Sequence, residues 1–364
     1  MNQVKNNRVL VIADIDENNL PDYLQEFCDK GFEVKTLRIG ALIPKSEIGV
    51  RVKRLLGMDI RRDVRARKKG LEKEIIAAVD AYEPSIVVEI NCMRLSAECA
   101  DYIRSKSFLC GTMIDRIQFF PAYFEEAFSE HYDMVCTYSL EDYQIIENIS
   151  HNCVFAPALA DERIYYKIDC EKDIDVSFVG RMYPTKDYGY RLKILQRLVK
   201  DLPGVKIYVG GECAPIRRPD KYIPWRLNKA YRRAFINRNI SQNECNEIYN
   251  RSKISLSIER AGTGSSWSGR LVNLLATETL VLSSDDGERT RAYFGGGMVF
   301  FSNYTELLAK IKHYLSNEEE RVAIAQKGYI QNKRMSEAEH ARESFAENVI
   351  ARRNAKMGVF DENN

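Results

Sequence analysis

The sequence of 364 residues predicts an α/β fold with two tandem domains, each built on a mostly parallel sheet. Three observations predict it. Short apolar runs alternate with segments of helical spacing along most of the chain. The alternation starts afresh after the polar, charged stretch Asp161–Asp173. The length suits two domains, and the 45% apolar content can fill two cores.

The first half reads as strands and helices in turn. The apolar run Arg8–Ile15 is typical of a buried parallel strand, and the helical segment Leu20–Lys30 stops at Gly31, a common helix end. Lys45–Tyr82 is mostly helical in character. Further strands are predicted over Phe32–Leu37, Pro84–Asn91, Ser107–Met113, Asp133–Tyr138 and Cys153–Ala156. This order indicates an open sheet covered by helices on both faces.

The second half repeats the pattern. Strands are predicted over Ile174–Val179, Val205–Val209, Ile254–Ile258, Leu280–Ser283 and Met298–Phe301. Helices are predicted over Tyr190–Lys200, Ser241–Ser252, Gly269–Thr277, Tyr304–Leu315, Glu318–Lys333 and Glu337–Arg353. We therefore expect Rossmann-like domains at residues 1–160 and 174–335, a linker at 161–173, and a C-terminal helix within 336–364 that packs back on the first domain.

Composition excludes several classes of protein. Nine Cys without a C-x-x-C pair argue against a disulfide framework and a zinc site, and the four His have no metal-ligand spacing. The apolar run Val9–Ala13 is too short for a signal peptide or a membrane span, so a cytoplasmic location is expected. The formal net charge is +2, but residues 1–170 carry −6 and residues 171–364 carry +8. The basic half is expected to handle an anion, although uneven surface charge alone explains the asymmetry about as well.

Two loops carry the chemistry. In the first, a strand runs into Gly180, followed by Arg181 and Lys186 before a helix; two cations there suit a pyrophosphate. In the second, Ser257–Arg270, a strand ends in a Gly- and Ser-rich loop before a helix. Its residues Gly262, Gly264, Ser265 and Ser266 can wrap a phosphate or sugar, and Ser268 can cap the helix. Ordinary solvated loops explain either composition nearly as well.

Together the two loops resemble the C-terminal domain of GT-B glycosyltransferases. The sequence is most similar to the spore maturation protein CgeB-like group and more distantly to glycosyltransferase family 4. Gly180-Arg181 followed by Lys186 resembles the family 4 phosphate pair. The stretch Arg270–Ala276 resembles the CgeB-like helix Arg-x-Phe-Glu-x-x-Ala.

The resemblance implies a sugar transferase that needs no metal and no cofactor beyond its donor, a UDP-, GDP- or dTDP-sugar. The second domain would bind the donor, and the first a glycan or lipid-linked acceptor. Donor-binding residues carried over are Gly180, Arg181, Lys186, Gly262, Gly264, Ser265, Ser266, Ser268, Arg270 and Asn273.

Two positions depart from the family pattern. Asn273 stands where a Glu usually contacts the nucleotide ribose, and Glu278 stands where the family usually has Gly. Glu259 resembles the family 4 Glu that contacts the donor sugar, and we assign it a catalytic role. For the base on the first domain, the strand-end candidates are Asp14, Asp16, Asn91 and Asp115. We favour Asp115 as catalytic because an aromatic loop follows it, while a helix-capping role is the simpler reading.

Two basic segments remain. Arg51–Lys69 mixes nine cations with apolar residues and is a candidate for contact with an anionic membrane. Arg217–Arg238 mixes cations with aromatic residues, as an interface does. A solvated helix face is the default for both, and nucleic acid is not an expected partner. The alternatives to a transferase are a GT-B sugar-nucleotide epimerase and a non-catalytic scaffold on a transferase fold.

Overall fold

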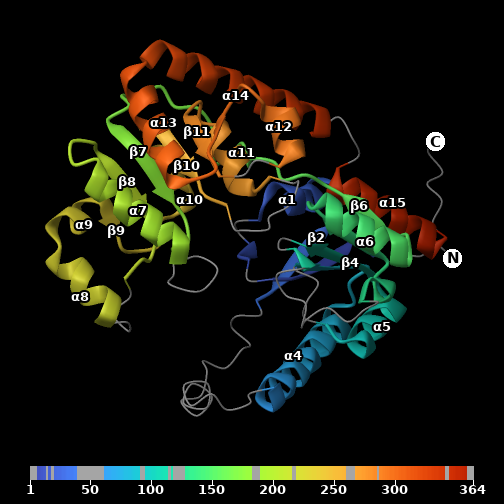
Figure 1. Ribbon diagram of the computed structural model, residues 1–364. Helices are drawn as coiled ribbons and strands as arrows, with labels where there is room; N and C mark the ends of the chain where they lie inside the picture. The colour runs from blue at the N-terminus through green and yellow to red at the C-terminus, as the bar shows by residue number, and fades with distance from the viewer. Residues whose placement is uncertain are drawn as a thin grey trace. The chain divides into compact units, whose positions relative to one another are not determined.

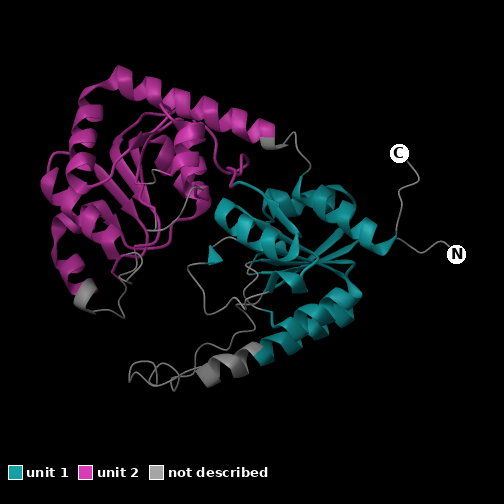
Figure 2. Cartoon of the chain, turned by 45° about the vertical axis from the view of Figure 1, so that its right-hand side comes forward, with its two compact units in different colours: residues 1–157, 342–364 teal, residues 158–341 magenta. Residues whose placement is uncertain are grey.

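The structure is a computed structural model that describes residues 6–13, 15–17, 20–38, 61–90, 95–113, 116–117, 128–182, 189–214, 219–259, 267–284, 287–340 and 344–358. At 61–68, 219–221 and 339–340 the description covers the backbone alone. The chain divides into two compact units (Figure 2). Unit 1 comprises residues 1–157 and 342–364, and unit 2 comprises residues 158–341.

Unit 1 contains a six-stranded sheet in which every neighbouring pair is parallel. Its strands are β1 (Arg8–Ile12), β2 (Glu33–Leu37), β3 (Ile86–Ile90), β4 (Phe108–Met113), β5 (Met134–Thr137) and β6 (Cys153–Phe155). They lie in the order β2-β1-β3-β4-β5-β6. The strand order therefore reverses between β1 and β3, as in doubly wound sheets.

Helices cover both faces of this sheet because its strands are apolar on both sides. The helices are α1 (Asp22–Asp29), α4 (Arg61–Tyr82), α5 (Ala97–Lys106), α6 (Leu140–Ser150) and α15 (Phe345–Met357), with a short 3₁₀ turn at Phe128–His131. α1 and α15 pack on one face, where Val9 and Val11 meet Phe27 and Val349. α4, α5 and α6 pack on the other face, where they meet the side chains of Leu10 and Ile12.

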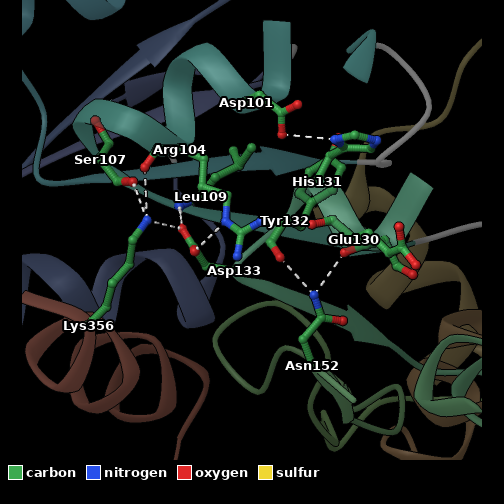
Figure 3. A network of polar contacts seen from close by, with 11 residues as sticks. Asp101, Arg104, Ser107, Leu109, Glu130, His131, Tyr132, Asp133, Asn152 and Lys356 are labelled. Carbon is green, nitrogen blue, oxygen red and sulfur yellow. Dashed lines mark hydrogen bonds and ion pairs between the residues drawn. The ribbon is translucent and has the colours of Figure 1, made fainter. Parts of the chain in front are cut away.

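The last helix of the chain, α15, is fixed to unit 1 by a polar network around Asp133 (Figure 3). The carboxylate of Asp133 accepts hydrogen bonds from Arg104 Nε (2.8 Å), Lys356 Nζ (2.8 Å) and the backbone N–H of Leu109 (2.9 Å). Lys356 Nζ also donates to the carbonyl oxygens of Arg104 (2.9 Å) and Ser107 (3.3 Å). One carboxylate thus joins α15, α5 and β4.

Unit 2 contains a second six-stranded sheet, again with all neighbouring pairs parallel. Its strands are β7 (Ile174–Val179), β8 (Ile207–Gly210), β9 (Phe235–Ile236), β10 (Ser252–Ser257), β11 (Leu280–Ser283) and β12 (Val299–Phe300). The order is β12-β11-β10-β7-β8-β9, so the first strand of the unit, β7, lies beside the fourth, β10. This is the strand order of dinucleotide-binding Rossmann domains.

The helices of unit 2 also form two layers. They are α7 (Gly189–Asp201), α8 (Pro219–Leu227), α9 (Lys229–Ala234), α10 (Gln242–Asn250), α11 (Gly269–Leu275), α12 (Glu288–Phe294), α13 (Tyr304–Ser316) and α14 (Glu318–His340). Residues of α7, α9 and α13 form one core with the side chains of Ile254, Leu256 and Ile258. Residues of α10, α11, α12 and α14 form the other core around Val281.

Two parallel sheets with helices on both faces confirm the predicted α/β class. The prediction of helices at Glu318–Lys333 and Glu337–Arg353 was wrong in its boundary, because α14 runs on to His340 and α15 begins at Phe345. The capping box of Ser344 and Glu347 explains the start of α15: each side chain accepts a hydrogen bond from the other residue's backbone N–H.

Candidate donor site at the switch point of the second sheet

The strand order of unit 2 selects one place for a ligand. In sheets of this type ligands bind beyond the carboxyl ends of the strands, where the strand order reverses. That point lies between β7 and β10. Gly180 follows β7, and Ile258 and Glu259 follow β10. The two loops that the sequence analysis singled out therefore leave the sheet side by side.

Glu259 is held in one position. Only 8% of the residue is exposed. Its Oε1 accepts hydrogen bonds from Ser257 Oγ (2.5 Å) and Ser268 Oγ (2.9 Å), and its backbone N–H donates to Ser284 Oγ (2.8 Å). Arg270 Nη1 lies 3.9 Å from the same Oε1. Two hydroxyls and one guanidinium thus stabilise a charged carboxylate at the switch point.

Arg270 reaches across from the second residue of α11 to the end of β7. Its Nη1 donates to the carbonyl oxygen of Ile258 (3.3 Å), and its Cζ lies 5.3 Å from the ring centroid of Phe178. A Cβ added at Gly180 would lie 3.1 Å from Arg270 Nη2. Glycine at 180 therefore gives the guanidinium room beside the backbone.

Arg191 was missed by the sequence analysis. It lies in the first turn of α7 and is 3% exposed, and its Nη1 donates to the carbonyl oxygen of Arg181 (3.3 Å). Burial and then the nearby charge of Arg270 lower the pKa of Arg191, while Tyr190 and Glu259 act in the opposite direction. Two guanidinium groups thus act on one carboxylate, which leaves an excess of positive charge. That excess suits an anionic ligand.

The other predicted donor residues fall in three groups. Arg181 is exposed, and Asn273 is half-buried on α11. Ser268 caps α11, because its hydroxyl accepts from the backbone N–H of Leu271 (3.4 Å). Outside the described residues lie Lys186, Gly262, Gly264, Ser265 and Ser266.

The predicted acceptor side is less fully described. Asp14, Asn91 and Asp115 lie outside the described residues, and Asp16 follows β1. Within the described part of the chain, no three His, Cys, Asp or Glu side chains gather as a metal would require. A search of the same residues for membrane spans found no helix with the necessary length and apolar character.

Glu278 has a backbone conformation that is unusual for a residue with a side chain. It follows α11 with φ of +50°, in the left-handed region where glycine is favoured. Its carboxylate pairs with Lys167 Nζ at 2.7 Å. Glu278 therefore occupies a backbone turn that favours glycine, and its side chain adds an ion pair there.

A family model described as glycosyl transferase-like matches residues 191–351. The match begins at Arg191 and takes in Glu259, Arg270 and Asn273. No curated protein matches this sequence. Most of unit 2 is therefore similar in sequence to a glycosyl transferase-like domain.

Solved structures extend the likeness to the whole chain. The α,α-trehalose 6-phosphate synthase from Burkholderia multivorans is similar over 97% of this chain and 99% of its own, at 11% identity and a TM-score of 0.64. The sucrose-phosphate synthase from Thermosynechococcus elongatus is similar over 96% of this chain and 97% of its own, at 12% identity and a TM-score of 0.63. A putative UDP-N-acetylglucosamine 2-epimerase from Listeria monocytogenes is similar over 96% of this chain and 96% of its own, at 11% identity and a TM-score of 0.59. At these identities the likeness shows the fold, and the fold is GT-B.

Proposed function

We propose that this protein is a glycosyltransferase that moves a sugar from a nucleotide-sugar donor to a glycan, lipid-linked or related acceptor. The observation that carries the proposal is that Arg191, Arg270 and Glu259 lie at the ends of β7 and β10, at the switch point of unit 2. The glycosyl transferase-like match over residues 191–351 supports it. We also propose that the protein belongs to the CgeB-like group, and the resemblance of Arg270–Ala276 to that group's helix supports this.

The proposed chemistry follows from charge. A nucleotide-sugar leaves a nucleoside diphosphate when the glycosidic bond forms, so the enzyme must stabilise negative charge on the pyrophosphate. We assign this to Arg181, Lys186 and Arg270, with Arg191 adding to the positive potential, and propose that no metal is needed. Glu259 would contact the donor sugar. Asp115, on unit 1, would accept the proton of the acceptor hydroxyl.

The donor assignment is tested by calorimetry of the full chain with UDP-, GDP- and dTDP-sugars. We expect one nucleotide to bind with nanomolar to micromolar affinity. Arg181→Ala and Lys186→Ala should each weaken binding at least tenfold, about 1.4 kcal/mol. Unchanged affinity in both variants would refute the assignment of the pyrophosphate. Binding of none of the nucleotides would favour a scaffold, for which the Asn273 departure is the main support.

A sugar-nucleotide epimerase is the second candidate, because the fold of the Listeria protein is similar over most of both chains. The two candidates differ in what they need. An epimerase changes the bound nucleotide-sugar with no acceptor present, whereas a transferase releases a nucleoside diphosphate only with an acceptor or water. Chromatography of the nucleotide-sugar after incubation with the protein alone separates them.

We also propose that the enzyme works in polysaccharide biosynthesis on the cytoplasmic side of a membrane, as a peripheral protein. The support is the composition of Arg51–Lys69, which has nine cations against two acids. Flotation with anionic vesicles tests this. Replacing Arg61, Arg62, Arg65 and Arg67 by Gln should weaken vesicle binding, and unchanged binding would remove this segment from the proposal.

A further inference from the structure

The helices α8 and α9, between β8 and β9, carry a surface that the proposed function does not use (Figure 1). Their inward side chains are aromatic. Trp225 Nε1 donates to the carbonyl oxygen of Phe235 (3.3 Å), and Tyr231 packs on Phe235 with ring centroids 5.6 Å apart. These contacts account for the aromatic residues of the basic segment Arg217–Arg238 as packing within unit 2.

The outward side chains are of another kind. Ile223 and Leu227, four residues apart on α8, are 53% and 78% exposed. This spacing puts both on one face of the helix. Burying such side chains is favourable. Two large aliphatic side chains exposed to solvent on adjacent turns of a helix therefore indicate that this face binds an apolar partner.

Cations flank the two aliphatic residues in the sequence of α8 and α9. Between Pro219 and Ala234 the sequence has five Lys or Arg against one Asp, a net charge of +4. Among them Arg226, Lys229, Arg232 and Arg233 are exposed. We define the α8–α9 face as these four cations with Ile223 and Leu227. Apolar groups among cations match a surface with anionic headgroups above a hydrocarbon layer.

We propose that the α8–α9 face docks on an anionic lipid bilayer, with Ile223 and Leu227 entering the headgroup boundary and the four cations pairing with lipid phosphates. A polyanion such as nucleic acid fits less well, because it offers nothing to the aliphatic pair. The inference does not depend on transferase activity, and it concerns residues other than Arg51–Lys69.

The test is flotation of the full chain with vesicles of phosphatidylcholine alone or with 30 mol% phosphatidylglycerol, at about 50 and 300 mM salt. The Debye length falls from roughly 14 Å to 6 Å between these salts. We expect binding to the anionic vesicles at low salt and at least tenfold less at high salt. Equal binding to both lipids, or no binding at low salt, would overturn the proposal.

Two variants and two matched controls locate the surface. Ile223→Ser/Leu227→Ser should bind anionic vesicles several-fold more weakly. Lys229→Gln/Arg232→Gln/Arg233→Gln should bind them about a hundredfold more weakly, at about fivefold for each cation lost. The apolar control is Val322→Ser/Ile330→Ser on α14, where the residues are 47% and 41% exposed. The charge control is Lys312→Gln/Lys333→Gln/Arg334→Gln, three exposed cations of α13 and α14.

Both controls should bind like the unchanged chain, and all four variants should keep its melting temperature and nucleotide affinity. Binding that falls equally in variants and controls would overturn the assignment to this face. So would a loss confined to the cationic variant, because a nucleic acid or other polyanion would produce the same pattern. Vesicle binding that only the Arg51–Lys69 variant abolishes would refute the α8–α9 face and leave the other segment's role intact.

Discussion

Adding one methyl group at Gly180 tests the geometry of the candidate donor site. In Gly180→Ala the new Cβ would lie 3.1 Å from Nη2 of Arg270 and 3.3 Å from its Cζ. Ordinary contacts begin near 3.4 Å, so the guanidinium must move by about 0.3 Å. Its bond to the carbonyl oxygen of Ile258 is already 3.3 Å long and would pass out of hydrogen-bonding range.

The magnitude follows from that one lost bond. We expect the free energy of unfolding of unit 2 to fall by about 1 kcal/mol, which lowers its melting temperature by about 2–4 °C. If Arg270 binds the pyrophosphate, affinity for the nucleoside diphosphate falls about fivefold as well. Calorimetry and thermal denaturation measure the two effects.

Gly204→Ala is the control, because no atom lies within 4 Å of a Cβ built there. It should leave both quantities within error of the unchanged chain. The reasoning would be wrong if Gly180→Ala behaved like Gly204→Ala. A loss of stability without a loss of affinity would keep the packing argument and remove Arg270 from the ligand site.

Three further predictions concern charge and backbone conformation. Arg191→Leu should weaken nucleoside diphosphate binding at least fivefold. The melting temperature should stay unchanged or rise, because burial already disfavours the charged form of Arg191. Lower stability with unchanged affinity would contradict this prediction. Asp133→Asn should lower the free energy of unfolding by about 1–3 kcal/mol and speed amide hydrogen exchange in α15. The control is Asp101→Asn, because the carboxylate of Asp101 is exposed and pairs with His131 at 2.8 Å; it should lower the free energy of unfolding by under about 0.5 kcal/mol. Glu278→Gly should raise the free energy of unfolding by up to about 1 kcal/mol, because relief of the positive φ exceeds the loss of the partly exposed ion pair with Lys167. Glu278→Ala should not raise it, and equal effects of the two substitutions would refute the backbone argument.

The sequence predicted the sheets well because parallel strands are short, apolar and bounded by breakers. β7 and β11 have the predicted ends. For Arg217–Arg238 the sequence predicted a helix face as the default but no helix bounds, and Pro224, which lies inside α8, is a residue that usually breaks a helix. The boundary before α15 was missed although Ser344 and Glu347 have the capping-box spacing, since the helical pattern on either side is nearly continuous.

The site was only partly predictable. Gly180 begins one loop whose composition points to a ligand, and Arg270 follows the other at the start of α11, so both were found from sequence alone. Arg191 was not, because an arginine beside Leu192 at the start of a helix looks like an ordinary solvent-facing residue. Its burial follows from the meeting of α7 with the ends of β7 and β10, which only the tertiary structure fixes.

The placement of α15 also sets an order of events during synthesis. Phe345, Ala346 and Val349 belong to the same core as Val9 and Phe27, more than 300 residues earlier. The ribosome therefore releases all of unit 2, a continuous stretch of chain, before α15 can complete the cover that α1 begins on one face of the first sheet. Until then the apolar side chains that α15 buries on that face, those of β4 and the adjoining side of α1, stay exposed to solvent. Nascent unit 1 is thus the part of this protein with most need of a chaperone, even though it is made first.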